Sequence, residues 1–273
     1  MVRSPGDVIA RGTRSTVHAY GRDAVVKVPD AATSESWIHF EAVYAEAARL
    51  SGAPVPRLLG IERIGGRAAS IWERVRGTSL WQHTVDTPGR SAELGTMLGD
   101  VHEALFALAV PVALPSQRDR LATKIRLAAA TIDTAHAEAL DLLPPPSGPP
   151  RLCHGDLHPS NVILSPRGPM LVDWFDASRG DPLADIARST LVLLAHGTDP
   201  PPHLPGADPA TLGRLTAAYL ARMAEHRDVA ESELHRWQAI NAVARMSEGV
   251  PRDVLLEVWN RYRNGRRLQT ATP

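Results

Sequence analysis

The chain has little cysteine and no long apolar segment. Cys153 is the single cysteine in 273 residues, which excludes an intrachain disulfide and any multi-cysteine metal site. The longest apolar runs, near residues 105–114 and 191–195, fall far short of the roughly 20 residues that a membrane-spanning helix needs. Residues 1–7 lack the apolar core of a signal peptide. We therefore expect a cytoplasmic protein that does not contact a membrane.

The chain also lacks an excess of charge of either sign. Its 30 basic and 30 acidic residues give a formal net charge of zero, which argues against a nucleic-acid partner and favours a small substrate that is recognised locally. Lysine is scarce, because only Lys27 and Lys124 are present and every other basic residue is arginine. Because lysine is so scarce, its abundance does not explain why a lysine stands at position 27.

The first part of the chain predicts a small β-sheet with one helix. Alternating apolar residues and turn residues predict five strands, at 7–10, 17–20, 24–28, 55–64 and 67–75. Apolar residues at helical spacing predict one helix over 34–50, which Ser51-Gly52-Ala53-Pro54 ends.

The chain becomes largely helical after Arg76-Gly77-Thr78. Helical spacing predicts helices near residues 94–108, 121–143, 183–196, 209–225, 231–248 and 253–263. Two proline-rich stretches, 144–150 and 200–209, predict loops. The expected fold class is α+β with two lobes. Residues 1–76 form an amino-terminal β-sheet lobe, and residues 77–273 form a larger, mainly α-helical lobe.

The segment with the clearest chemistry is His154-Gly155-Asp156-Leu157-His158-Pro159-Ser160-Asn161, followed by Leu171-Val172-Asp173-Trp174. It places two aspartates and an asparagine on two adjoining loops. Phosphoryl transfer requires a carboxylate that accepts the proton of a hydroxyl substrate and oxygen ligands for a magnesium ion that bridges the phosphates. Asp156 suits the first role, and Asn161 and Asp173 suit the second.

This segment resembles the catalytic loop of the aminoglycoside phosphotransferase and choline kinase-like family, which has a protein kinase-like fold. The aspartate and asparagine of the kinase signature lie five positions apart, as Asp156 and Asn161 do. The resemblance implies that Asp156 is the catalytic base and that Asn161 and Asp173 hold Mg²⁺. It also implies supporting roles for three residues. His154 and Asp185 would hold the catalytic loop in place, and Asp181 would cap the helix that follows.

The resemblance extends upstream to the nucleotide-binding residues. The turn that contains Gly12 and Ser15 takes the position of the kinase glycine loop, and Lys27 takes the position of the lysine that contacts the phosphates. A flexible lysine needs a carboxylate to orient it. Glu41 and Glu46 are the candidates, and distance from the pair Val55-Pro56 favours Glu41.

Residues 71–77 resemble the hinge of the family. An adenine edge presents one donor and one acceptor, so an extended backbone can bind it through the Glu73 carbonyl and the Val75 amide. Trp72 would border the base and could restrict which base fits. We expect ATP as the nucleotide, and GTP is not excluded.

The predicted function is ATP-dependent transfer of the γ-phosphoryl group to a hydroxyl of a small molecule, an aminoglycoside or another amine-bearing metabolite. The alternatives are a metabolite kinase of the choline, amino-sugar or homoserine type, and a catalytically silent nucleotide-binding protein of the same fold. Protein phosphorylation is disfavoured because no Ala-Pro-Glu sequence follows Asp173. The sequence does not indicate an oligomeric state.

The acceptor is expected between the catalytic loop and the carboxy-terminal helices. Acidic side chains there would suit a polyamine, and an aromatic cage would suit a quaternary ammonium group. The candidate residues are of both kinds: Glu231, Glu233, Trp237, Arg245, Glu248, Trp259 and Tyr262.

Overall fold

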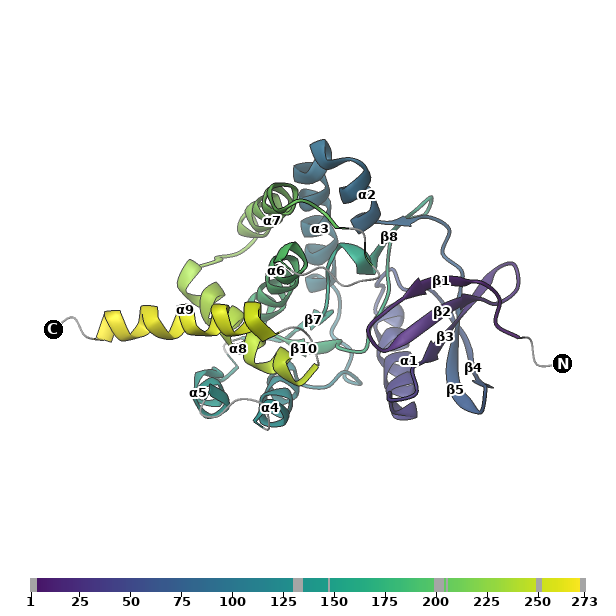
Figure 1. Cartoon of the computed structure of the whole chain (residues 1–273), viewed down its shortest axis with the longest axis horizontal. Helices are drawn as coiled ribbons and strands as arrows, with labels where there is room; N and C mark the ends of the chain where they lie inside the picture. Colours follow the sequence, from purple (N-terminus) through teal and green to yellow (C-terminus); the bar gives the residue numbers. More distant parts are fainter. Residues whose placement is uncertain are drawn as a thin grey trace.

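The computed structural model describes residues 4–129, 135–146, 148–198, 204, 206–248 and 252–270, with side chains described to residue 265. Figure 1 shows a twisted β-sheet at the amino-terminal end, a mainly helical body at the other end, and helix α1 between them. The predicted α+β fold class with a small β-sheet lobe and a larger helical lobe is confirmed.

The amino-terminal sheet contains five antiparallel strands in the order β1-β2-β3-β5-β4. Its elements are β1 (Val8–Arg11), β2 (Ser15–Ala19), β3 (Ala24–Pro29), β4 (Leu58–Ile64), β5 (Arg67–Glu73) and α1 (Glu35–Leu50). Strand β3 is central, and Lys27 on it pairs with Val17 on one side and Ser70 on the other. The predicted strand over 55–64 begins only at Leu58, because Pro56 has no N–H for a ladder and restricts the residue before it.

The helical lobe contains more elements than the sequence predicted. Its helices are α2 (Leu80–Asp86), α3 (Ser91–Phe106), α4 (Gln117–Ala128), α5 (Ala135–Leu142), α6 (Pro182–Thr198), α7 (Pro209–Ala224), α8 (Glu231–Arg245) and α9 (Arg252–Thr270). Short strands form two further sheets around the catalytic segment: β6 (Thr78–Ser79), β7 (Arg151–Cys153), β8 (Val162–Ser165), β9 (Gly168–Leu171) and β10 (Ser178–Gly180).

Two of the predicted helices have different bounds. The helix predicted over 121–143 corresponds to two helices, α4 and α5, with residues 130–134 outside the described part of the chain. The helix predicted over 231–248 ends at Arg245 and continues as a 3₁₀ turn, Met246–Glu248. Of the two predicted proline-rich loops, residue 147 of the first and residues 200–203 and 205 of the second lie outside the described residues.

One hydrophobic core joins the two lobes. Ala45 and Ala48 of α1 pack in the same cluster as Leu98 of α3 and Trp174 of the catalytic segment. The Leu171 N–H donates to the carbonyl of Pro54 at 2.7 Å, which adds a backbone link across the lobes. Because α1 is part of the shared core, Glu41 on that helix is held in a fixed position relative to the catalytic segment.

Helices α3 and α7 approach each other closely at glycines. A Cβ atom on Gly95 would lie 2.2 Å from the Leu215 carbonyl oxygen, so only glycine fits there. None of the helices in the described part of the chain is both long enough and apolar enough to cross a membrane.

Candidate active site

Lys27 connects the sheet lobe to the catalytic segment. Its Nζ lies 2.6 Å from Glu41 Oε1 and 3.1 Å from Asp173 Oδ1. Glu46, the other predicted candidate, instead accepts hydrogen bonds from Arg49 one turn along the same helix. Burial alone would lower the pKa of Lys27, but Asp173 and Glu41 raise it above its usual value, so the ammonium remains charged.

One aromatic ring packs against Lys27, and a second packs on the first. Lys27 Nζ lies 4.4 Å from the centre of the Trp37 ring, and Trp37 packs on Phe175 at 5.1 Å between ring centres. Phe175 follows the metal-ligand candidate Asp173 by two residues. The contact between Trp37 and Phe175 therefore ties α1 to the loop that carries Asp173.

The catalytic loop runs from β7 to a 3₁₀ turn at Pro159–Asn161. Gly155 adopts φ = 79°, and a Cβ atom there would lie 2.1 Å from the Asp176 carbonyl oxygen, so this position requires glycine. The carboxylate of Asp185 accepts hydrogen bonds from the N–H groups of His154 and Gly155 at 2.8 and 2.9 Å. His102 contacts the same carboxylate at 3.0 Å. Buried Asp185 thus fixes the residues immediately before Asp156.

The side chain of Asn161 is oriented by the loop itself. Its amide nitrogen donates to the Asp156 carbonyl at 2.9 Å and contacts His158 Nε2 at 3.1 Å. These bonds use the nitrogen and leave the Oδ1 oxygen as the atom suited to a metal ion. His158 acts as a hydrogen-bond partner within the loop.

Asp173 adopts φ = 65°, the only positive φ of a non-glycine residue in the described part of the chain. A left-handed conformation costs an ordinary residue roughly 1–2 kcal/mol, and such strain is concentrated at functional sites. The side chain of Asp173 is 40% exposed despite its contact with Lys27, so it is accessible from the cleft.

Asp156, the predicted catalytic base, forms an ion pair with a buried arginine that the sequence did not reveal. Arg188 of α6 donates to Asp156 Oδ1 at 3.0 Å through Nη2 and at 3.2 Å through Nε. Burial alone would raise the pKa of Asp156, but Arg188 and His158 hold it well below its usual value. Asp156 is consequently ionised at neutral pH.

The ion pair belongs to a larger set of charges, with cations on α4, α6 and α8 and carboxylates on the loops and the 3₁₀ turn beside them, which we call the acceptor-side charge cluster. Lys124 bridges Asp176 at 2.6 Å and Glu248 at 2.8 Å. Glu248 also pairs with Arg188 at 3.1 Å. The complete cluster comprises Arg120, Lys124, Asp156, Asp176, Arg188, Arg245 and Glu248.

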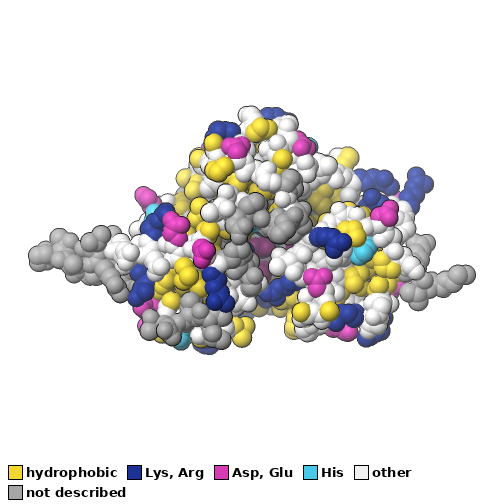
Figure 2. All heavy atoms as spheres, viewed as in Figure 1, with side chains coloured by type: hydrophobic (Ala, Val, Ile, Leu, Met, Phe, Trp, Pro, Cys, Tyr) yellow, Lys and Arg dark blue, Asp and Glu magenta, His cyan; other side chains and the backbone are white. Residues whose placement is uncertain are grey.

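A cleft of about 580 Å³ connects these groups. Its walls come from the β1–β2 turn (Gly12 and Ser15), from α4, from the catalytic segment (Asp156 and Asp173) and from residues 245–248. Figure 2 shows the surface hollowed between the two lobes, with acidic and basic side chains near the hollow. The structure therefore brings the β1–β2 turn, Asp156 and Asp173 to one cleft.

The β1–β2 turn is closed by its own backbone. The Gly12 N–H donates to the Ser15 carbonyl at 2.9 Å. A Cβ atom on Gly12 would meet only ordinary contacts, the nearest at 3.6 Å, so packing does not require glycine there. The binding of phosphate by Gly12 and Ser15 stays a prediction.

The hinge residues lie where β5 leaves the sheet. Glu73 ends β5, and Val75 is two residues further along. The Arg74 N–H donates to the Asp23 carbonyl at 3.0 Å, and the Glu73 carboxylate pairs with Arg167. The predicted adenine contacts of the Glu73 carbonyl and the Val75 amide stay a prediction.

Only two of the predicted acceptor candidates line this cleft, namely Arg245 and Glu248. Trp237 and Trp259 are buried in the core. Glu233 and Tyr262 border a different groove, between α5, α8 and α9, and Glu231 is exposed. Of the two alternatives, the aromatic cage is not formed by these residues at the cleft, because helix packing turns Trp237 and Trp259 inward.

The sequence contained one unused signal for the cluster. The scarcity of lysine that drew attention to Lys27 applies equally to Lys124, which lines the cleft, whereas Lys27 lies behind Asp173, its partner in the cleft wall. No motif marks Arg188 or Asp176 as members of the cluster, because their partners lie on helices far away in the sequence.

The donor set suits a hard cation that is shared with a bound nucleotide. Among the residues that the structure describes, no group of three or more His, Cys, Asp or Glu side chains could hold a metal ion alone. Asp173 and Asn161 offer one carboxylate and one amide oxygen. Mg²⁺ in nucleotide enzymes typically binds to one or two protein oxygens plus phosphates and water, so these residues fit such an ion.

Comparison with known proteins gives a family match and several similar folds. Residues 8–225 match the sequence pattern of the phosphotransferase enzyme family. No curated protein matches the chain. A choline/ethanolamine kinase family protein from Mesorhizobium loti has a TM-score of 0.56 at 16% identity, covering 99% of this chain and 89% of that one.

Two further structures show the same likeness. An aminoglycoside-3'-phosphotransferase of type VIII has a TM-score of 0.63 at 22% identity, covering 87% of this chain and 91% of that one. An amicoumacin kinase, in complex with AMP-PNP, Ca²⁺ and its ligand Ami, has a TM-score of 0.55 at 14% identity, covering 99% and 91%. At these identities the likeness establishes a shared fold.

Proposed function

The chain belongs to the phosphotransferase enzyme family, and on that premise we propose that it transfers the γ-phosphoryl group of ATP to a hydroxyl of a small molecule. The resemblance noted in the sequence is confirmed by this membership. The observation that carries the proposal is that Asp156 and Asp173 line one cleft and that Lys27, far away in the sequence, pairs with Asp173 there.

The nucleotide side of the cleft would bind the phosphates. Lys27, held by Glu41 and Asp173, supplies a positive charge, and the β1–β2 turn with Gly12 and Ser15 covers the phosphates from the sheet lobe. The Glu73 carbonyl and the Val75 amide would bind the base. This division corresponds to a lobe boundary at residues 76/77, between β5 and β6.

Asn161 and Asp173 would hold Mg²⁺, which when bound neutralises charge on the phosphates. The strained backbone of Asp173 and the Asn161 amide, fixed through its nitrogen, leave oxygens for this purpose. The amicoumacin kinase contains a nucleotide analogue and a divalent cation, which supports this assignment.

Asp156 would orient the acceptor hydroxyl and receive its proton. The hydroxyl oxygen forms a bond to the γ-phosphorus, the bond from that phosphorus to the β–γ bridging oxygen breaks, and ADP departs with that oxygen. Arg188 keeps Asp156 ionised and fixes its direction. A carboxylate with a low pKa acts chiefly by orienting the nucleophile, which suits a loose transition state.

The test is a panel of acceptors read by coupled ADP release, with ATP and GTP in parallel. The panel contains aminoglycosides, other antibiotics, choline, amino sugars and hydroxy amino acids. We expect Mg²⁺-dependent ADP release with at least one acceptor and its loss in Asp156→Asn. Magnesium-dependent nucleotide binding without transfer to any acceptor would instead indicate a silent nucleotide-binding protein, and phosphate appearing in protein would indicate a protein kinase.

A further inference from the structure

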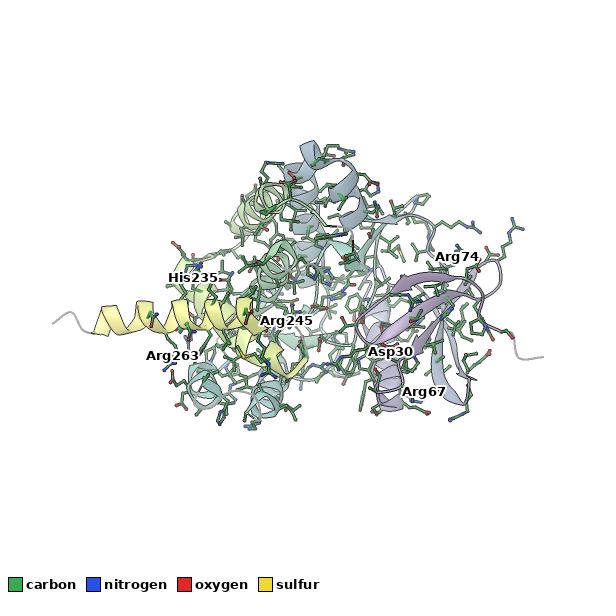
Figure 3. All side chains as sticks on the ribbon, in the orientation of Figure 1. Asp30, Arg67, Arg74, His235, Arg245 and Arg263 are labelled. Atoms are coloured by element: carbon green, nitrogen blue, oxygen red, sulfur yellow. The ribbon has the colours of Figure 1, made fainter. Side chains whose placement is uncertain are left out.

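Arg245 is the one member of the acceptor-side charge cluster that is buried without a close carboxylate partner. Its residue exposure is 8%, and its Nε and Nη1 atoms find no hydrogen-bond partner among the described residues. The nearest carboxylate oxygen, Glu248 Oε2, lies 3.6 Å from Nε, beyond hydrogen-bond distance. Figure 3 labels Arg245 close to the middle of the molecule, and its side chain lines the cleft beside Asp156.

The carboxylates around Arg245 are already used by other cations. Asp156 is bound by Arg188, and Asp176 is bound by Arg120 and Lys124. Glu248 is bound by both Lys124 and Arg188 at 2.8 and 3.1 Å. The cluster therefore holds four cationic side chains against three carboxylates, and the surplus positive charge falls on Arg245.

Burial without a counterion is unfavourable for a guanidinium group. Burial and the neighbouring Arg188 lower the pKa of Arg245 from its usual value, in contrast to Arg188, whose pKa is raised. Arg245 lies at the wall of an open cleft, so an anion that enters the cleft would relieve this unfavourable burial. The planar fork of N–H donors also matches two oxygens of one anionic group.

We propose that Arg245 binds an anionic oxygen group of the acceptor, a carboxylate or a phosphate, and positions the acceptor hydroxyl at Asp156. This inference rests on the proposed phosphoryl transfer and names the class of acceptor. It disfavours a polycationic acceptor, since the acids of the cluster that such a molecule would need are already paired with Arg120, Lys124 and Arg188. The remaining charged residues of the cleft lining are Arg14, Asp119 and Asp173; the first two are of opposite sign and Asp173 is paired with Lys27, so they do not alter this balance.

The first experiment measures binding rather than transfer. Glycerate, serine, threonine, homoserine and gluconate are each compared with the corresponding primary amide, and glycerol phosphate with glycerol. Calorimetry with AMP-PNP and Mg²⁺ present gives the affinities. We expect at least one anionic member to bind about 30-fold or more tightly than its neutral partner, the factor typical of a buried charge pair. Preference for the phosphate pair alone would identify the group as phosphate.

Variants then assign the preference to Arg245. Arg245→Gln should abolish the difference between acid and amide, whereas Arg261→Gln, at an exposed arginine of α9 outside the cleft, should leave it unchanged. Arg245→Lys keeps the charge but loses the planar fork, and it should reduce the preference only in part. If the glutamine variant does not fold, as judged by circular dichroism, the acid and amide affinities of the lysine variant are compared with those of the wild type instead.

The outcomes separate this inference from the proposed function. Equal affinity for both members of every pair, or binding of none of them, overturns the anion site. Equal loss of turnover with every acceptor in Arg245→Gln also overturns it, because that result places the arginine at the transferred phosphoryl group. Anion binding through Arg245 without any phosphoryl transfer would retain the site and reject the phosphotransferase activity. Transfer to polyamines with no preference for acids would retain the phosphotransferase activity and reject the anion site.

Discussion

The two sides of the cleft are built in different ways. The nucleotide side has one lysine between two carboxylates, and its members Lys27, Glu41 and Asp173 stand at positions that a sequence motif marks. The acceptor side has seven charged side chains from several helices and loops, and of these only Asp156 belongs to a motif. The residues common to nucleotide enzymes thus lie in short sequence motifs, whereas the residues on the acceptor side are brought together by helix packing.

The two sides also differ in charge balance. Lys27 faces two carboxylates and has a raised pKa, so the nucleotide side leaves an acidic group for a metal ion. On the acceptor side the carboxylates are paired, and an arginine is left over. If both assignments are right, substitutions on the nucleotide side should change the response to nucleotide and Mg²⁺, and substitutions on the acceptor side should change acceptor selection or stability.

The largest effect is expected for Asp156→Asn, where the two sides meet. The amide keeps the shape but cannot accept the proton, so kcat should fall by about 10²–10⁴-fold while the KM for ATP changes little. Steady-state kinetics with an accepted substrate measures both. The control is Asp119→Asn, at an exposed aspartate of the cleft rim, which should retain activity. Full activity in Asp156→Asn would remove this residue from the mechanism.

The next effect is on stability, from Arg188→Gln. This change leaves the partly buried Asp156 without its arginine and Glu248 with Lys124 alone, and it should cost up to about 3 kcal/mol of unfolding free energy, the lower end for breaking a buried ion pair. Denaturant unfolding measures the loss. Arg222→Gln, at a more exposed arginine paired with Asp100, should cost less than about 1 kcal/mol. Equal losses in the two variants would contradict a structural role for the cluster.

The same cluster predicts how stability depends on pH. Despite burial, which alone would raise the pKa, neighbouring cations lower the pKa of Asp156, Asp176 and Glu248 in the folded protein. A carboxylate with a lowered folded pKa stabilises the protein above its unfolded pKa of about 3.9–4.3, and this stabilisation is lost as the pH falls through the folded pKa. The unfolding free energy should therefore decline below about pH 5, and the curves of the wild type and of Arg188→Gln should converge in acid. Parallel curves down to pH 3 would contradict the coupling.

The smallest effect is expected on the nucleotide side, for Glu41→Gln. Glutamine can still accept a hydrogen bond from Lys27 but no longer supplies a charge, so the KM for ATP should rise about tenfold, near the lower end for a hydrogen bond to a charged group. Glu46→Gln, one turn further along the same helix, should leave the KM unchanged because Glu46 contacts Arg49. A change in acceptor selectivity of Glu41→Gln without a change in its KM for ATP would contradict the assignment of Glu41 to the nucleotide side.

Much of the fold could be predicted because its signals are local. Apolar periodicity indicated helix α1 and the strands β3 and β5, and the fixed spacing of Asp156, Asn161 and Asp173 indicated the catalytic loop. The single helix predicted over 121–143 was wrong, since α4 ends at Ala128 and α5 begins at Ala135, and apolar periodicity alone does not mark these ends. The short strands β6 to β10 were missed because two to four residues give too little pattern to detect.

The sequence by itself determined which groups we propose for phosphoryl transfer, since spacing along two adjoining loops fixes the order of the proposed base and the two proposed oxygen ligands. The tertiary structure agreed with the sequence that Glu41 rather than Glu46 meets Lys27, and it alone decided that Arg188 holds Asp156 and that Arg245 has no hydrogen-bonded carboxylate beside them. The physical reason is that a buried charge depends on its nearest neighbours in space. Here those neighbours come from α4, α6 and α8, whose separation along the chain carries no information about their distance.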